Sequence, residues 1–262
     1  MGMSACGSKI PTLNAYLREP RAKRVMISYY YYKYHSGIRF VADGILKWNE
    51  ENPTERIDIM VDSGAFSLMT NKDLIDTINI DDYTKEYGAF ITKHEKNINR
   101  FVELDIQVIV GVREYDRLYK LLDEHTPSGI KPTIVWHVTE DLSKFEKDLD
   151  RCIAQGDNLI CIGGAAALKV TTRRDLGRMM KELCWYAAGR GVNVHGLGIT
   201  SRVARYIDFY SVDSLSFIYD TINNREAEGV GKGRIRDNYG THGGFVYACL
   251  TGKLMQYYWD LY

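Results

Sequence analysis

The sequence lacks an excess of charge of either sign. Lys and Arg together number 34, and Asp and Glu together also number 34, so the formal net charge is zero. This balance excludes a protein that attracts nucleic acid through its overall field, so any such binding must come from a local basic patch. With 45% hydrophobic and 26% charged residues over 262 positions, the composition is typical of one large soluble globular domain.

Cysteine is scarce and unsuitably spaced for a structural site. The chain has five cysteines, an odd number, and none of them forms a CxxC pair. A disulfide framework or a four-cysteine zinc site is therefore not expected, and reduced thiols are typical of a cytoplasmic protein. The HxH and HExxH spacings of zinc enzymes are also absent. We expect no metal ion and no cofactor; a metal held by His137, His195 and the nearby acids is the alternative.

Long apolar runs are missing as well. No stretch approaches the ~20 apolar residues of a membrane span, and residues 1–24 lack the apolar core of a signal peptide. We therefore expect no membrane association and a cytoplasmic location.

The sequence does contain an alternation of strand-like and helix-like segments. Apolar and β-branched runs predict strands, and apolar residues at helical spacing predict helices. The predicted strands cover 24–33, 57–63, 102–111, 131–138, 158–164, 192–198 and 209–214. The predicted helices cover 37–51, 81–101, 115–124, 141–153, 171–191 and 200–207. Such an alternation predicts a parallel sheet in an α/β protein.

The predicted fold is a (β/α)8 TIM-type barrel. The first strand is followed by SYYYYKYHSG rather than by the glycine-rich fingerprint of doubly wound sheets. The eighth strand has no secure place in the sequence. No boundary indicates a second domain, so residues 1–262 are expected to form a single domain. Residues 221–244 are glycine-rich, charged and aperiodic, and we interpret them as a long loop.

Polar residues and glycines follow the apolar runs at the carboxyl ends of the predicted strands, where a barrel carries its chemistry. These positions are Asp62, Asp105, His137, Gly163–Gly164, His195–Gly196 and Asp213. A single acid here could simply cap the next helix, and a single Gly-Gly could simply form a turn. Together they would converge on one barrel mouth, where paired carboxylates suit glycosyl transfer.

Five short motifs in a fixed order carry a resemblance to a known family. They are VDSGAF (61–66), LD (104–105), ICIGG (160–164), VHGLGI (194–199) and SVDS (211–214). In this order the chain resembles the tRNA-guanine transglycosylase (queuine tRNA-ribosyltransferase) superfamily. It is most similar to the compact phage-type relatives linked to 7-deazaguanine modification of DNA. The resemblance covers about residues 24–217, nearly the whole predicted barrel.

The resemblance implies a role for each matching residue. Asp213 would be the nucleophile that attacks the sugar C1′, and Asp62 would transfer protons as one base leaves and another enters. Asp105 would accept hydrogen bonds from the Watson–Crick edge of guanine. Ser211 and Ser214 are expected to offset the burial of the Asp213 charge. The other expected base-binding residues are Ser63, Gly163, Gly164, His137, His195 and Gly196.

One departure from the family favours DNA over RNA as the substrate. The tRNA enzymes carry a CxCxxC…H zinc insertion that helps to hold tRNA, whereas Cys249 stands alone here. The expected activity is that of a pentosyltransferase that replaces guanine in DNA with a free 7-deazaguanine base, such as 7-cyano-7-deazaguanine. Lys232, Arg234 and Arg236, in the 221–244 loop, are expected to hold the phosphate backbone. The alternatives are a tRNA-guanine transglycosylase and a metal-dependent barrel hydrolase that uses the same acids.

Overall fold

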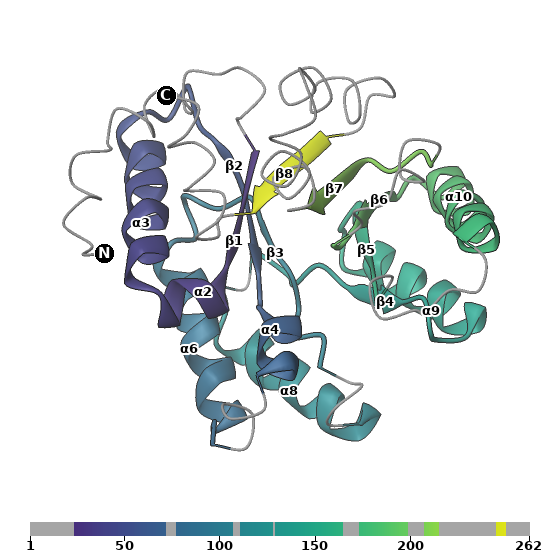
Figure 1. The fold of residues 1–262 in the computed structure, drawn as a ribbon, viewed down its shortest axis with the longest axis horizontal. Helices are drawn as coiled ribbons and strands as arrows, with labels where there is room; N and C mark the ends of the chain where they lie inside the picture. The colour runs from purple at the N-terminus through teal and green to yellow at the C-terminus, as the bar shows by residue number, and fades with distance from the viewer. Residues whose placement is uncertain are drawn as a thin grey trace, which may run out of the picture. The chain divides into compact units, whose positions relative to one another are not determined.

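The computed structural model describes residues 24–71, 77–106, 111–127, 129–164, 173–198, 207–214 and 245–249 (Figure 1). The chain divides into two compact units. The first comprises Met1–Pro132 and Leu250–Tyr262, and the second comprises Thr133–Cys249. Each unit combines parallel strands with helices, so the predicted α/β class is confirmed.

Three parallel strands lie in the first unit, in the order β3, β2, β1. They are β1 (Arg24–Ser28), β2 (Asp58–Asp62) and β3 (Arg100–Phe101). The register pairs Ser28 with Asp62 at the carboxyl ends of β1 and β2. The helices among the described residues of this unit are α2 (Tyr29–Tyr34), α3 (Ser36–Glu51), α4 (Ala65–Thr70), α6 (Ile80–Lys93) and α8 (Val112–Glu124).

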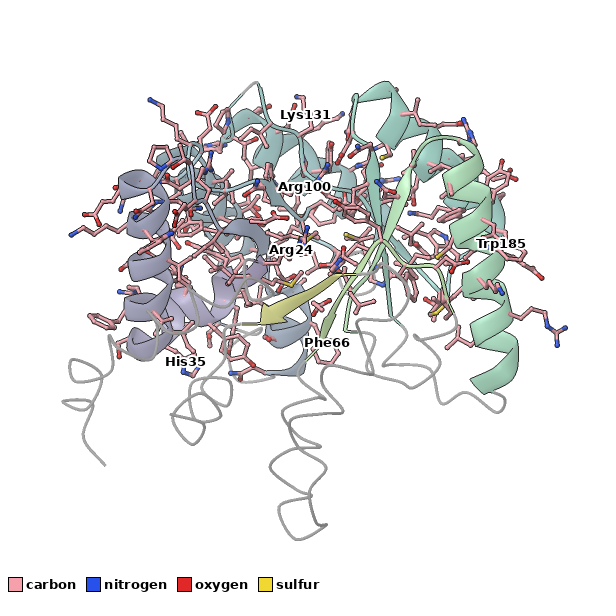
Figure 2. All side chains as sticks on the ribbon, turned by 90° about the horizontal axis from the view of Figure 1, so that it is seen from above. Arg24, His35, Phe66, Arg100, Lys131 and Trp185 are labelled. Atoms are coloured by element: carbon pink, nitrogen blue, oxygen red, sulfur yellow. The ribbon has the colours of Figure 1, made fainter. Side chains whose placement is uncertain are left out.

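The strands of the first unit point their carboxyl ends to one side of the unit. Figure 2 shows Arg24 and Arg100, at the amino ends of β1 and β3, apart from His35 and Phe66. His35 and Phe66 follow the carboxyl ends of β1 and β2. The centres of β1 and β2 are buried at consecutive positions, from Val25 to Ile27 and from Ile59 to Val61. Consecutive burial is the pattern of parallel strands covered on both faces.

The side-chain amide of Asn49 connects α3 to the chain at the amino ends of β2 and β3. Asn49, in α3, is 2% exposed, and its Nδ2 donates hydrogen bonds of 2.9 Å to the carbonyl oxygens of Ile57 and Asn97. Its Oδ1 accepts a third bond, of 2.7 Å, from the Ile57 N–H. Ile57 lies just before β2 and Asn97 shortly before β3. The amide therefore joins α3 to the entry of both strands without leaving a buried polar group unpaired.

The strand predicted over 24–33 is wrong beyond Ser28, because Tyr29–Tyr34 form the helix α2. The Tyr29 ring packs against the rings of Tyr83 and Tyr87 in α6, with centroids 5.2 Å apart in both pairs. Tertiary packing of these aromatic rings overrides the strand preference of a tyrosine run.

The segment between α6 and α8 also differs from its prediction. The helix predicted over 81–101 ends at Lys93. One bond beyond β3 (Arg100–Phe101), from the Val102 N–H to the Val61 carbonyl oxygen at 2.8 Å, extends the contact with β2. The strand predicted over 102–111 is wrong at residues 103–106, which form no strand, and residues 107–110 of that prediction lie outside the described residues.

Five parallel strands lie in the second unit, in the order β8, β7, β6, β5, β4 (Figure 1). They are β4 (Val135–His137), β5 (Leu159–Gly163), β6 (Asn193–Gly196), β7 (Ser211–Ser214) and β8 (Phe245–Cys249). Helix α9 (Leu142–Ala154) connects β4 to β5, and α10 (Arg173–Gly189) connects β5 to β6. The strands predicted over 131–138, 158–164, 192–198 and 209–214 and the helices predicted over 141–153 and 171–191 are confirmed with shifts at their ends. β8 is a strand that no prediction covered.

The two faces of the second sheet differ in character. One face presents alternate apolar residues to the apolar sides of α9 and α10. These strand residues are Trp136, Ile160, Ile162, Val194 and Val212. Because side chains alternate between faces along a strand, the intervening positions point away from the two helices. Those positions include the polar residues of the candidate site, which are His137, His195, Ser211 and Asp213.

Several expectations lie outside the described residues. They include nearly all of the predicted helix over 200–207 and the whole of the 221–244 loop. Within the described ranges, no helix is both long and apolar enough to cross a membrane.

Candidate functional site

The Asp-Ser-Gly turn after β2 is fixed by its own hydrogen bonds. The carboxylate of Asp62 accepts a bond from the Gly64 N–H at 3.0 Å. The hydroxyl of Ser63 accepts one from the Ala65 N–H at 3.3 Å, and the Tyr83 hydroxyl donates to the Ser63 carbonyl oxygen at 2.6 Å. These bonds hold both the side chains and the backbone of the turn, so the Asp62 carboxylate has a defined orientation at the end of β2.

Gly64 is required by its conformation and by its surroundings. Its φ is +77°, a region that favours glycine. A Cβ at this position would lie 2.3 Å from the Tyr30 Cβ and 2.9 Å from the Tyr30 backbone nitrogen. The turn therefore packs directly on the start of α2, and no larger residue fits without moving the backbone.

Three acids, Asp62, Glu103 and Asp105, lie close enough to interact in the first unit. The Ser63 hydroxyl also reaches Asp105 Oδ1, at 3.4 Å. Burial raises the pKa of Asp105 well above its ordinary value, and the negative charges of Asp62 and Glu103 raise it further. Glu103 is fully buried, whereas Asp62 and Asp105 are half-buried. Asp105 therefore keeps its proton at pH values where an exposed aspartate has lost it.

Sequence reasoning missed Glu103 as a member of this acid group. Its signal is visible in VELDI (102–106), where two acids, Glu103 and Asp105, interrupt one apolar run. Two tyrosines of α6 were also missed as site residues: Tyr83, and Tyr87, whose hydroxyl donates to the Val102 carbonyl oxygen at 2.8 Å. They hold the backbone from which the acids project.

A histidine joins two residues of the neighbouring strand in the second unit. The Nδ1 atom of His195, in β6, lies 2.7 Å from Ser211 Oγ, and its Nε2 atom lies 3.3 Å from Asp213 Oδ1. The register pairs His195 with Ser211, and Asp213 follows two positions later on the same face. The Gly198 N–H also donates to Asp213 Oδ1, at 2.7 Å.

The three side chains of this site differ in their exposure to solvent. His195 and Ser211 are both 0% exposed, whereas the side chain of Asp213 is 13% exposed. Of these three side chains, only that of Asp213 is in contact with solvent. The arrangement differs in this respect from a Ser-His-Asp hydrolase site, in which the serine must be accessible because it is the nucleophile.

His137 and the Gly-Gly pair form a third feature, at the ends of β4 and β5. The register pairs His137 with Gly163. A Cβ added to Gly163 would lie 3.3 Å from the His137 Nδ1, and one added to Gly164 would lie 3.2 Å from it. Gly164 also has a φ of +79°. Both glycines therefore make room for the imidazole ring, and burial lowers the pKa of His137.

Not every predicted site residue gains the expected neighbours. His195 was expected to bind the base, but its ring contacts Ser211 and Asp213. Ser211 was expected to offset the burial of Asp213, but its hydroxyl contacts His195. Gly196 is buried at the end of β6, where it pairs with Ile162. Lys232, Arg234 and Arg236 lie outside the described residues. Among the described residues, no three His, Cys, Asp or Glu side chains are grouped so that they could hold a metal ion.

Comparison of the chain with family models, curated proteins and solved structures found no match in any of the three. The function must therefore be inferred from the site residues themselves. Asp62 and Asp105 lie in the first unit with acidic neighbours, and Asp213 lies in the second with hydrogen-bond donors.

Proposed function

We propose that the protein is a (β/α)8-barrel transglycosylase that replaces guanine in DNA with a 7-deazaguanine base. The observation that carries the proposal is the state of Asp213. Its carboxylate lies on strand β7, accepts a hydrogen bond from the Gly198 N–H, and is the partly exposed group beside the fully buried His195–Ser211 pair. A carboxylate held in this way suits attack on an anomeric carbon.

The reaction consists of two displacements at the same carbon. In the first, a carboxylate oxygen of Asp213 bonds to C1′ as the bond from C1′ to the guanine nitrogen breaks. The electron pair leaves with guanine, which takes up one proton. In the second, the incoming base loses a proton, attacks C1′ and displaces Asp213. We assign both proton transfers to Asp62, so the net proton balance is zero.

Asp105 is proposed to recognise the base. The N1–H and the exocyclic N–H of a guanine-type base are two donors side by side, and one carboxylate can accept both bonds. A 7-deazaguanine base presents the same pair of donors. The raised pKa of Asp105 implies that binding a base in this way releases a proton.

Analysis of nucleosides by mass spectrometry tests the proposal. DNA and tRNA are each incubated with the protein and with candidate bases, among them 7-cyano-7-deazaguanine, and are then digested to nucleosides. The deazaguanine nucleoside is expected in DNA with the wild type and not with Asp213→Asn. Its appearance in tRNA alone would establish the RNA enzyme instead. Its absence from both substrates with every base would overturn the proposal.

The basic loop predicted from the sequence offers a second test. Replacing Lys232, Arg234 and Arg236 with Gln should weaken DNA binding and flatten its salt dependence, by a slope of roughly one unit for each phosphate that is no longer bound. Binding of the free base should not change. Unchanged DNA affinity and an unchanged salt slope would remove this loop from the DNA interface.

A further inference from the structure

We propose that His195 is a positioning residue for Asp213, and that Ser211 sets the imidazole tautomer that allows it to act. The catalytic consequence of this inference rests on the proposed function, because it concerns the rate at which Asp213 attacks C1′. Its structural content, the location of one proton on a buried ring, does not depend on any substrate.

The two ring nitrogens of His195 face groups of different character. A serine hydroxyl can donate a hydrogen bond, and Ser211 Oγ lies 2.7 Å from Nδ1. If Ser211 donates, Nδ1 is the acceptor and the ring proton lies on Nε2. Nε2 is the atom that lies 3.3 Å from Asp213 Oδ1. The opposite tautomer would direct a lone pair at a carboxylate oxygen, so the contacts together favour the proton on Nε2.

The constellation is rigid because it is built on paired strands. His195 and Ser211 are register partners in β6 and β7, and both are 0% exposed. The Gly198 N–H donates a hydrogen bond of 2.7 Å to Asp213 Oδ1, the oxygen that His195 Nε2 also contacts. This hydrogen bond and the imidazole contact approach the carboxylate from separate points and restrict its rotation, as a preorganised catalytic group requires.

During the reaction the proton stays on His195. Attack on C1′ converts the Asp213 carboxylate into a neutral ester, and the electron pair of the broken bond leaves with guanine. The second displacement restores the carboxylate beside the Nε2 atom, with which Asp213 Oδ1 is in contact at 3.3 Å. His195 therefore orients the carboxylate and stabilises it as a leaving group, and transfers no proton itself.

A matched pair of variants separates positioning from packing. In His195→Gln the amide nitrogen reaches the place of Nε2, whereas in His195→Asn it reaches the place of Nδ1. The single-turnover rate of the covalent protein–DNA adduct should stay within about 10-fold of wild type for Gln and fall about 10²-fold for Asn. The KM for the free base should be the same in both variants. Equal rates in the two variants, or a wild-type rate in His195→Asn, would overturn the proposal.

Nitrogen NMR of the imidazole provides a readout that needs no activity. The His195 resonances are assigned by their loss in His195→Gln. The wild type should show a protonated Nε2 and an unprotonated Nδ1, and Ser211→Ala should weaken this preference. A proton on Nδ1 in the wild type would overturn the inference even if base exchange occurs. The expected tautomer in a protein that exchanges no base would instead refute the proposed function and leave the positioning of Asp213 intact.

Discussion

The two Asp-Ser pairs of this chain occupy similar places and have opposite surroundings. Asp62 ends β2 and Asp213 lies near the end of β7, and a serine follows each of them. In the first unit, Asp62 belongs to a group with two further acids, where burial raises the pKa of Asp105 and the negative charges of Asp62 and Glu103 raise it further. In the second unit, Asp213 meets an imidazole and a backbone N–H.

The contrast shows that the neighbours of a strand-end aspartate determine its chemical role. Crowded acids retain protons and can exchange them, which suits proton transfer and base recognition. A carboxylate among donors is oriented and kept available for attack. The same dipeptide can thus serve two steps of one reaction, provided that the surroundings differ.

The largest effect is expected from Asp213→Asn. The amide keeps the shape of the carboxylate but is a far poorer nucleophile, so base exchange should fall by at least about 10³-fold. The wild type, given DNA and no incoming base, should form a protein–DNA adduct that survives denaturation, and the variant should not. Circular dichroism and DNA binding serve as controls and should be unchanged. A rate of base exchange near that of the wild type in Asp213→Asn would show that Asp213 has a structural role only, and that the two aspartates do not divide the reaction between them.

Asp105→Asn tests the other side of the comparison. Loss of the charged acceptor should weaken binding of guanine-type bases by about 10²-fold and relax the preference for them. In the wild type, binding should strengthen as pH rises through the raised pKa of Asp105, because only the ionised form accepts both N–H bonds. Calorimetric titration over a pH series measures both effects. A pH-independent affinity in the wild type would contradict the role of Asp105.

Gly64→Ala examines how the first turn holds its acid. The substitution combines a positive φ with a clash against Tyr30, and should lower the free energy of unfolding by about 2–4 kcal/mol. Gly156→Ala is the matched control, since Gly156, just after α9, has a φ of +75° and nothing within 4 Å of its added Cβ. It should cost only about 1 kcal/mol. Equal costs in chemical denaturation would mean that contact with α2 does not fix the turn.

The smallest effect is expected on the thermal stability of Asp105→Asn. Because Asp105 has a folded-state pKa above its unfolded value, the folded protein loses stability as pH rises between the two. Asp105→Asn removes this penalty and should raise Tm by a few degrees at neutral pH, at about 2–4 °C per kcal/mol. In acid, below the ordinary aspartate pKa, the difference should vanish. A lower Tm for the variant at neutral pH would show that the acid group stabilises the fold.

The sequence predicted the strand ends better than the strands themselves. Asp62, His137, Gly163 and Asp213 all lie at or near the carboxyl ends of their strands, because an apolar run ending on a polar residue is a local signal. The tyrosine run failed because its helix depends on ring contacts with α6, some 50 residues later.

Partners across strands were harder to foresee than positions within them. The contact of His195 with Ser211 and Asp213 depends on the register of β6 and β7, which single-strand patterns do not encode. The buried role of Glu103 has the same origin, since only the folded chain shows that it raises the pKa of Asp105. Strand β8 was missed because FVYAC (245–249) follows a long aperiodic segment.

The amide of Asn49 has a consequence for mutational tolerance. It locks the entry of β2 and β3, whereas Asp62 and Asp105 follow their carboxyl ends. A library of variants can be sorted once for cellular abundance and once for activity per molecule. Variants at the amino ends of these strands should then differ from variants at their carboxyl ends. Changes at Asn49 should lower abundance, because an unpaired buried polar group favours unfolding and degradation. Changes at the acids should leave abundance intact and lower the activity of each molecule.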